Sequence, residues 1–376
     1  MSTTSPGAPL SESELRRQDA AWQEMVDRAQ AGWHTSEVLV REVVQRATGT
    51  TMVSRRRLLA GLSNEVYEVA TAAGEPVIVR ISHRDVPHFE QERWAIDRCR
   101  EVGVPVPAIL LLEHRQEGGR PLSVCVEGRL PGVPLGRVVR SLDRQAPRAV
   151  RLLREAGELL ARLHTVSTAG HGALDARGRG HLPTWDRYLL HGLDTPARRE
   201  QIAGLAAPAG KHGAGETAET VCKAARTLDV ALAVLLDHRP FLRSRPSRLL
   251  HRDYEPWHIF VDEDPKGGIT GVIDLESCTG GDPAYDLVQW HVIHDSYAPV
   301  DPVVTGYRAG RAWTADFERA LRLGCVQFRV RELLRELDTL TGAGSPSLPG
   351  ISLDAERAGA VRTKVALLQR DVDRLS

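Results

Sequence analysis

The 376-residue chain has no surplus of charge, few cysteines and no long apolar run. Its 49 Lys and Arg residues balance its 49 Asp and Glu residues, so charge gives no case for a nucleic-acid or anionic-membrane partner. The five cysteines are scattered without a Cys-x-x-Cys pair, which argues against a disulfide framework or a zinc site. No apolar run approaches the roughly 20 residues of a membrane span, and residues 1–10 do not resemble a signal peptide. We therefore expect a cytoplasmic protein with reduced thiols.

The length favours two lobes over one small core. Residues 1–50 carry two helical patterns and are expected to form an N-terminal helical extension. Period-two alternation then predicts five strands, with one helix after the third strand: strands 57–60, 65–70, 76–81, 109–113 and 122–126, and helix 87–102. This order matches the small lobe of a protein kinase.

Beyond residue 128 the pattern is mainly helical, apart from a variable insertion at 168–216 that is rich in Gly, Ala and Pro. The predicted fold class is therefore α+β. We expect a protein-kinase-like, two-lobe fold with a small β-rich N-lobe at 51–128 and a larger, mainly helical C-lobe at 129–376.

The segment from Leu250 to Val261 reads Leu-His-Arg-Asp-Tyr-Glu-Pro-Trp-His-Ile-Phe-Val. It places Asp253 in a His-x-Asp turn and a possible metal ligand, His258, five residues later. Asp274 follows an apolar strand pattern, twenty-one residues after Asp253. Kinase-like folds use such a constellation to hold an attacking hydroxyl and nucleotide-bound magnesium around a transferring phosphoryl group.

Four residues of this constellation have predicted roles. Asp253 is the candidate catalytic base for a substrate hydroxyl, and His251 is expected to brace the turn through hydrogen bonds. Asp274 is the candidate Mg²⁺ ligand, because hard oxygen ligands suit this cation. His258 is the second metal candidate, although imidazole suits softer metals, so a structural role for His258 stays open. Taken singly, Asp253 and Asp274 could also be ordinary turn residues.

In the small lobe, Arg80 ends the strand pattern Val77-Ile78-Val79, where a kinase places its phosphate-pairing lysine. Glu92 lies on the next predicted helix and can pair with Arg80. Arginine binds phosphate and carboxylate in a bidentate way, so the replacement keeps the charge but alters the geometry. A plain surface ion pair is the alternative.

Two further segments are candidates for nucleotide contact. The turn Gly61-Leu62-Ser63-Asn64 lies between two predicted strands and could cover phosphates, with Ser63 and Asn64 as the candidate residues. An ordinary hairpin turn is almost as well supported, because the turn is not Gly-x-Gly-x-x-Gly. By topology alone, the nucleobase of ATP or GTP should meet the backbone between the lobes, at Val126 and Gly128.

Together these residues resemble the aminoglycoside phosphotransferase superfamily, which has a protein-kinase-like fold and includes antibiotic, choline and homoserine kinases. The resemblance runs from residue 58 to residue 340 and takes in the Gly61 turn, Val79-Arg80-Ile81, Glu92, Leu163-His164, the His251 segment, Ile273-Asp274 and the Gly281–Leu287 segment. It implies that Asp253 is the base and Asp274 the metal ligand, with Mg²⁺ and ATP or GTP. It also implies that Asp286 braces the catalytic loop. His258 stands where the family usually has Asn, and Arg252 where it commonly has Gly.

Three hypotheses about function follow. The first is an O-phosphotransferase acting on an antibiotic, for resistance or self-protection. The second is a kinase of a primary metabolite such as an amino alcohol or sugar. The third is a nucleotide-binding protein that no longer catalyses. Only eleven residues separate Asp274 from Asp286, too few for a protein-kinase activation loop, so we expect a small-molecule substrate and no protein substrate.

The charge of the presumed substrate region bears on the first hypothesis. Residues 280–344 hold nine Asp and Glu against seven Arg, which favours an antibiotic less cationic than an aminoglycoside. Aromatic residues (Trp290, Trp313, Tyr297 and Tyr307) could supply stacking surface, although core packing is the alternative that we expect for at least two of them. Polar residues could contact the substrate. The candidate substrate contacts are Trp290, Tyr307, His291, Asp282 and Asp295.

Overall fold

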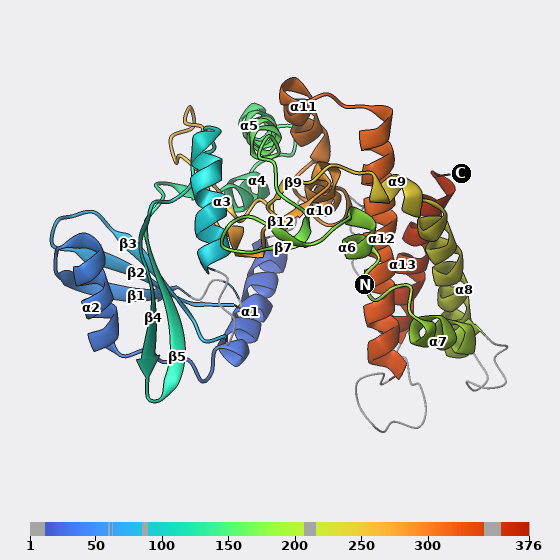
Figure 1. Cartoon of the computed structure of the whole chain (residues 1–376), viewed down its shortest axis with the longest axis horizontal. Helices are drawn as coiled ribbons and strands as arrows, with labels where there is room; N and C mark the ends of the chain where they lie inside the picture. Colours follow the sequence, from blue (N-terminus) through green and yellow to red (C-terminus); the bar gives the residue numbers. More distant parts are fainter. Residues whose placement is uncertain are drawn as a thin grey trace.

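A computed structural model of the chain describes residues 12–58, 61, 63–84, 89–206, 216–341 and 355–375. Figure 1 shows a lobe built on one sheet beside a larger helical lobe. Each lobe has its own apolar core, one between α2 and the sheet and one spanning the larger lobe and α3. The predicted α+β class and two-lobe arrangement are confirmed.

The small lobe contains a five-stranded antiparallel sheet in the order β1-β2-β3-β5-β4. Its elements are α1 (Glu12–Ala29), α2 (Glu37–Thr48), β1 (Met52–Leu58), β2 (Glu65–Thr71), β3 (Val77–Ser82), α3 (Phe89–Glu101), β4 (Ile109–Glu117) and β5 (Arg120–Gly128). The predicted order of three strands, a helix and two strands is confirmed. β1 begins at Met52, earlier than predicted, while residues 59–60 and 87–88 of the predicted elements lie outside the described residues.

Strand alternation decides which way Arg80 points. Val77, Val79 and Ile81 of β3 are buried in the core between the sheet and α2. Because successive side chains of a strand face opposite sides, Arg80 projects from the other face of the sheet, where it meets Glu92 of α3. The apolar pattern of β3 thereby aims a cation toward the larger lobe.

The larger lobe is mainly helical. Its helices are α4 (Leu135–Ser141), α5 (Pro147–Leu163), α6 (Trp185–Leu189), α7 (Pro196–Ala206), α8 (Glu216–Asp237), α9 (Arg239–Arg243), α10 (Asp286–Val292), α11 (Val300–Gly310), α12 (Ala315–Thr341) and α13 (Ala355–Asp373). Its short strands are β6 (Val133–Pro134), β7 (His171–Leu174), β8 (Gly180–Leu182), β9 (Arg248–Leu250), β10 (Ile259–Val261), β11 (Ile269–Val272) and β12 (Thr279–Gly281). Helices α8, α12 and α13 pack side by side, at the end of the molecule away from the sheet (Figure 1).

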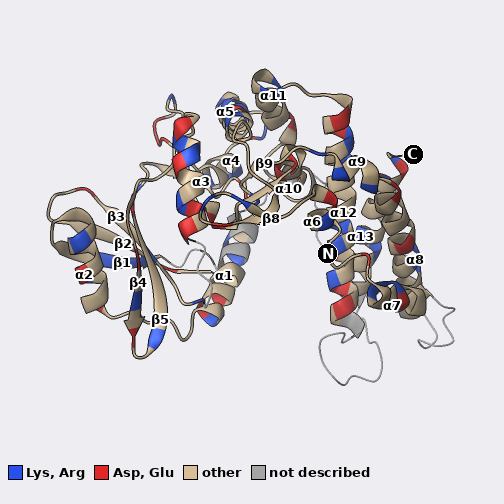
Figure 2. Ribbon diagram, viewed as in Figure 1, with Lys and Arg blue, Asp and Glu red and all other residues tan. Residues whose placement is uncertain are grey.

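The segment predicted as a variable insertion is built into this lobe. Its strand β7 pairs with β12, and its helix α7 packs on α8. Acidic and basic residues are interspersed on both lobes, with both signs along α3 and α12 (Figure 2), in keeping with the balanced composition. Among the described residues, no helix combines the length and apolar character needed to cross a bilayer.

Two glycines bring α5 and α11 into close contact. A Cβ atom on Gly157 would lie 1.9 Å from the Val303 carbonyl oxygen, and one on Gly306 would lie 1.9 Å from the Arg154 carbonyl oxygen. Only residues without a side chain allow this approach. The crossing brings Tyr307 of α11 within hydrogen-bond distance of His164, which follows α5 directly.

Candidate functional site

One buried carboxylate holds the turn that follows β9. Asp286, the first residue of α10, accepts hydrogen bonds from the backbone amides of His251 (2.7 Å) and Arg252 (2.9 Å). Arg252 has a left-handed backbone with φ of 70°, a conformation that costs a non-glycine residue roughly 1–2 kcal/mol. The Asp286 carboxylate therefore stabilises a strained turn, and this turn presents Asp253.

A histidine in turn holds Asp286. His164 has its Nε2 3.1 Å from the Asp286 carboxylate and its Nδ1 2.9 Å from the Tyr307 hydroxyl. Because a carboxylate only accepts, Nε2–H donates, and the hydroxyl donates to Nδ1 of a neutral ring, in keeping with the lowering of the His164 pKa by burial. Burial alone would raise the pKa of Asp286, but His164 and the Arg252 amide outweigh it and lower that pKa.

His251 joins this turn to the residue before Asp274. Its Nε2–H donates to the Ile273 carbonyl (3.0 Å), and its Nδ1 accepts from the Asp253 amide (3.3 Å). Burial lowers the pKa of His251, which favours the neutral ring that these two bonds require. The imidazole therefore links the backbones on which Asp253 and Asp274 are carried.

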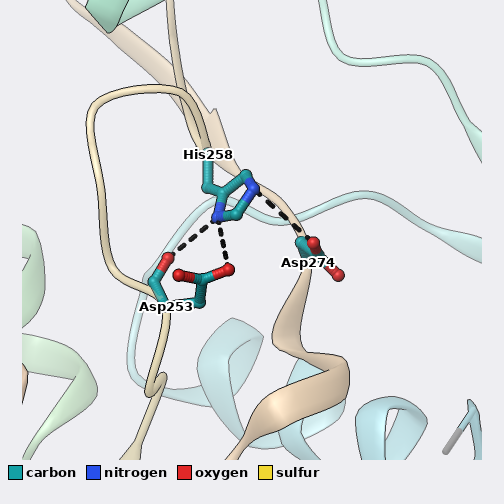
Figure 3. Close-up of side chains that lie close together, drawn as sticks. All are labelled: Asp253, His258 and Asp274. Atoms are coloured by element: carbon teal, nitrogen blue, oxygen red, sulfur yellow. Dashed lines mark hydrogen bonds and ion pairs between the residues drawn. The ribbon is translucent and has the colours of Figure 1, made fainter. Parts of the chain in front are cut away.

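Asp253, His258 and Asp274 meet in the space between these segments (Figure 3). His258 Nδ1 lies 2.8 Å from the Asp253 carbonyl oxygen and 3.5 Å from its Oδ2, while Nε2 lies 3.5 Å from Asp274 Oδ2. Since a carbonyl only accepts, Nδ1 carries a proton, and Nε2 faces Asp274. Burial works to lower the pKa of His258, but the carboxylates of Asp274, Asp253 and Glu255 raise it overall.

These three side chains fit a divalent cation. One ligand atom from each lies within 4.8 Å of the others. Carboxylate oxygens suit Mg²⁺, and imidazole nitrogen suits softer divalent ions. The donor set therefore fits a cation held mainly by oxygen, with Nε2 of a neutral His258 as the nitrogen ligand.

Arg80, on β3, supplies positive charge on the small-lobe side of the site. Its guanidinium lies 2.7 Å from Glu92, 3.2 Å from Glu276, 3.3 Å from Asp274 and 3.6 Å from Glu127. Burial raises the pKa of both Glu92 and Glu127 against the opposing effect of Arg80. The pKa of Glu92 is raised to about 8, so Glu92 is mostly protonated at neutral pH, and Arg80 faces the carboxyl groups of Glu276, Asp274 and Glu127 as well.

Ser63 and Asn64, the predicted phosphate-contacting residues of the Gly61 turn, also lie on the small-lobe side of the site. Asn64 Nδ2 donates to Glu276 Oε2 at 2.6 Å, and Ser63 Oγ accepts from Arg84 at 2.5 Å. The Gln91 side chain donates to the Glu276 carbonyl at 2.7 Å. Asn64 therefore joins the group around Arg80, whereas Ser63 lies at its edge.

The predicted nucleobase contacts, Val126 and Gly128, lie on β5 among paired strands. The Gly128 amide donates to the Ala108 carbonyl at 2.9 Å, so this amide is not available to a base. Val126 lies inside the sheet, opposite Val79 on β3 and Leu111 on β4, instead of at an open edge. Antiparallel pairing on both sides of β5 accounts for both placements.

Three of the five predicted substrate contacts are wrong, because their side chains are buried. Trp290 and Tyr307 are 0% exposed, and Asp282 is 1% exposed. Asp282 accepts from the Ala284 amide at 2.9 Å and pairs with Arg245, so it caps a turn. His291 is half-buried and Asp295 is exposed, and these two stay candidates.

Several charged residues near the site escaped prediction. Glu255 lies 3.7 Å from His258 Nε2 and 3.5 Å from His294 Nε2. The Arg140 guanidinium lies between the rings of Trp257 (5.0 Å) and Tyr297 (4.6 Å). Glu255 and Glu276 each follow a candidate carboxylate by two residues, which is the one local signal that could have found them.

A family model matches most of the chain. Residues 54–321 match the family model of a phosphotransferase enzyme family. The chain belongs to this family. The predicted resemblance and the kinase-like fold are therefore confirmed, as is the prediction of a phosphotransferase.

Solved structures with the same fold cover nearly the whole of this phosphotransferase. A microcompartment-associated aminopropanol kinase is 19% identical, with a TM-score of 0.58, and the match covers 90% of this chain and 97% of that one. A putative fructosamine-3-kinase from Thermobifida fusca is 18% identical, with a TM-score of 0.54 and coverage of 89% and 98%. The GDP and kanamycin complex of APH(2″)-IIia is 15% identical, with a TM-score of 0.52 and coverage of 90% and 98%. At these identities the likeness shows the fold alone.

Proposed function

We propose that this phosphotransferase moves the γ-phosphoryl group of ATP or GTP to a hydroxyl group of a small molecule, with Mg²⁺. The observation that carries the proposal is the meeting of Asp253 and Asp274 around His258, with Arg80 paired to Asp274. Among the described residues, Asp253 has no guanidinium partner, whereas Asp274 is paired with Arg80, which suits a base and a metal ligand. The GDP complex of a structural relative supports a nucleotide co-substrate.

The proposed chemistry divides among the chain's own residues. Asp253 accepts a hydrogen bond from the substrate hydroxyl and takes its proton as the substrate oxygen bonds to the γ-phosphorus. The bond from that phosphorus to the bridging oxygen breaks, and ADP or GDP leaves. His251 and Asp286 keep the Asp253 turn in place, and Arg80 offers positive charge to the nucleotide phosphates. Asp274 and His258 would hold Mg²⁺, which neutralises phosphate charge when it is bound.

For the acceptor we propose an antibiotic that carries little positive charge. Arg140 lies between Trp257 and Tyr297 and acts electrostatically on Glu255, so the surroundings of Asp253 combine aromatic faces with both signs of charge. A polycationic aminoglycoside would prefer a clearly acidic surface. The second candidate is a primary metabolite such as an amino alcohol, for which the Glu255 carboxylate is a suitable partner of an ammonium group.

A turnover screen tests this proposal. ATP and GTP, each with Mg²⁺, are offered with macrolides, nucleoside antibiotics, aminoglycosides, choline and homoserine, and nucleoside diphosphate release is measured. Turnover that depends on one weakly charged antibiotic class is the expected result. Turnover with a primary metabolite alone would favour the second candidate. Nucleotide binding without turnover on any acceptor would favour the third hypothesis, a protein that no longer catalyses.

The metal role of Asp274 gives a first prediction. Asp274→Ala should raise the Mg²⁺ concentration for half-maximal turnover by about tenfold or more and lower kcat, because one hard oxygen ligand is lost. Steady-state kinetics across a Mg²⁺ titration measure both quantities. Asp229→Ala removes an exposed helical carboxylate and serves as the control. An unchanged Mg²⁺ dependence in Asp274→Ala would count against the ligand role.

The role of His258 gives a second prediction. His258→Asn should keep turnover within about tenfold and shift the preference from Mn²⁺ toward Mg²⁺, because an amide oxygen replaces an imidazole nitrogen. The measurement is kcat with each metal, and His181→Asn, at an exposed position, is the control. Complete loss of turnover with both metals would show that the imidazole has a further role.

A further inference from the structure

The N-terminal extension reaches the proposed nucleotide site through one buried glutamine. Gln30 directly follows α1 and is 2% exposed. Its Nε2 donates to the carbonyl oxygens of Gly61 (2.9 Å) and Asn64 (3.1 Å), and its Oε1 accepts from Arg57 (2.9 Å). Arg57 orients the amide, and the amide holds two backbone carbonyls of the turn between β1 and β2.

Residues that follow Gln30 attach the extension to the same end of the sheet. The Trp33 ring is stacked on His83, with centroids 5.0 Å apart and 9° between the planes. The Thr35 hydroxyl donates to Glu65 at 2.7 Å, and His83 lies 3.0 Å from the same carboxylate. Burial alone would raise the pKa of Glu65, but these partners outweigh it and hold the pKa at about 2. Glu65 therefore stays ionised and bound to the extension at neutral pH.

The turn that Gln30 holds carries a residue of the site. Asn64 accepts from Gln30 through its backbone carbonyl and donates to Glu276 Oε2 (2.6 Å) through its side chain. Glu276 Oε2 also lies 3.2 Å from Arg80. Two hydrogen bonds, through Asn64, therefore connect the extension to the carboxylate beside Arg80. Figure 1 shows α1 on the side of the sheet that faces the larger lobe.

We propose that Gln30 is a positioning residue for nucleotide binding, acting by fixing the backbone of Gly61 and Asn64 beside the phosphates. The inference rests on the proposed function, since it assumes that the Arg80 side of the site receives the nucleotide. A turn whose carbonyls are already held loses little conformational entropy when a ligand binds, whereas a freed turn has to be ordered at that moment. In this proposal, the N-terminal extension contributes to nucleotide binding.

The test compares Gln30→Met with Gln45→Met. Methionine keeps the volume of glutamine but has no donor for the two carbonyls, and Gln45 is an exposed glutamine on α2. ADP and GDP affinities are measured by titration calorimetry with Mg²⁺, and KM for nucleotide, KM for acceptor, kcat and Tm are measured alongside. We expect Gln30→Met to weaken nucleotide binding and raise nucleotide KM by about tenfold. Acceptor KM should stay unchanged, and Gln45→Met should match the wild type.

Each other outcome overturns a defined part of the inference. A lower Tm with unchanged nucleotide affinity and KM would mean that Gln30 is merely structural, and the inference would be wrong. If Gln30→Met does not fold, Arg57→Lys replaces it, because it removes the fork that orients Gln30 but keeps the charge. Unaltered nucleotide affinity in Arg57→Lys would then refute the positioning role. A wild-type protein that binds neither ADP nor GDP would refute the proposed function itself.

Discussion

Replacing Asp253 with alanine should lower kcat by about 10³-fold and leave nucleotide affinity nearly unchanged. A positioned general base contributes roughly 10²–10⁴-fold to a rate, and Asp253 is the carboxylate of the site that is held on a braced turn without a guanidinium partner. Its side chain is 41% exposed, so a substrate hydroxyl can reach it. The bond from His258 Nδ1 goes to the Asp253 backbone carbonyl and survives the substitution. Single-turnover kinetics and nucleotide titration together measure the effect.

The isosteric variant Asp253→Asn sharpens this test. It keeps the shape of the side chain and one acceptor oxygen but cannot take a proton at neutral pH, so its kcat should fall nearly as far. Asp229→Ala, at an exposed position on α8, should behave as the wild type. Near-normal turnover in either Asp253 variant would refute the assignment of the base.

Replacing Asp286 with alanine should cost both stability and turnover. The carboxylate accepts from the His251 and Arg252 amides and from His164, and all of these groups except the partly exposed Arg252 are buried. Removing one partner of a buried charged network costs about 3–5 kcal/mol. The left-handed turn at Arg252 also loses the bonds that offset its strain. We therefore expect a free energy of unfolding lowered by about 3–5 kcal/mol and a kcat below a tenth of the wild-type value.

Urea denaturation and turnover at a temperature where the variant is folded separate the two effects. Asp286→Asn keeps the volume but loses the negative charge and one acceptor oxygen, so its loss of stability should be smaller than that of Asp286→Ala. A folded Asp286→Ala protein with wild-type kcat would show that the Asp253 turn does not depend on this carboxylate.

The sequence predicted those parts of the site that depend on short spacing. Strand alternation in β3 is a property of local backbone geometry, and it aimed Arg80 away from the apolar core as the pattern indicated. His251 and His258 lie in one short loop between β9 and β10, so these residues could be recognised together. The same holds for Asp274, which directly follows a short apolar strand pattern.

Predictions from residue type alone failed where packing decides exposure. Trp290 and Tyr307 have the aromatic faces that ligands use, yet both are buried in the core of the larger lobe. Nothing in the sequence distinguishes an aromatic residue that lines a site from one that fills a core, because burial depends on which helices pack around it.

By itself, the sequence determined the family, the two-lobe fold and the carboxylates that carry the proposed chemistry, because these follow from local periodicity and short motifs. The tertiary structure alone decided which other distant groups meet: Gln30 with Gly61, and Asn64 with Glu276 across 212 positions. Hydrogen bonds act over about 3 Å, so the packing of the lobes determines which residues far apart in the chain become partners. The spacing of such residues in the sequence gives no signal of the contact.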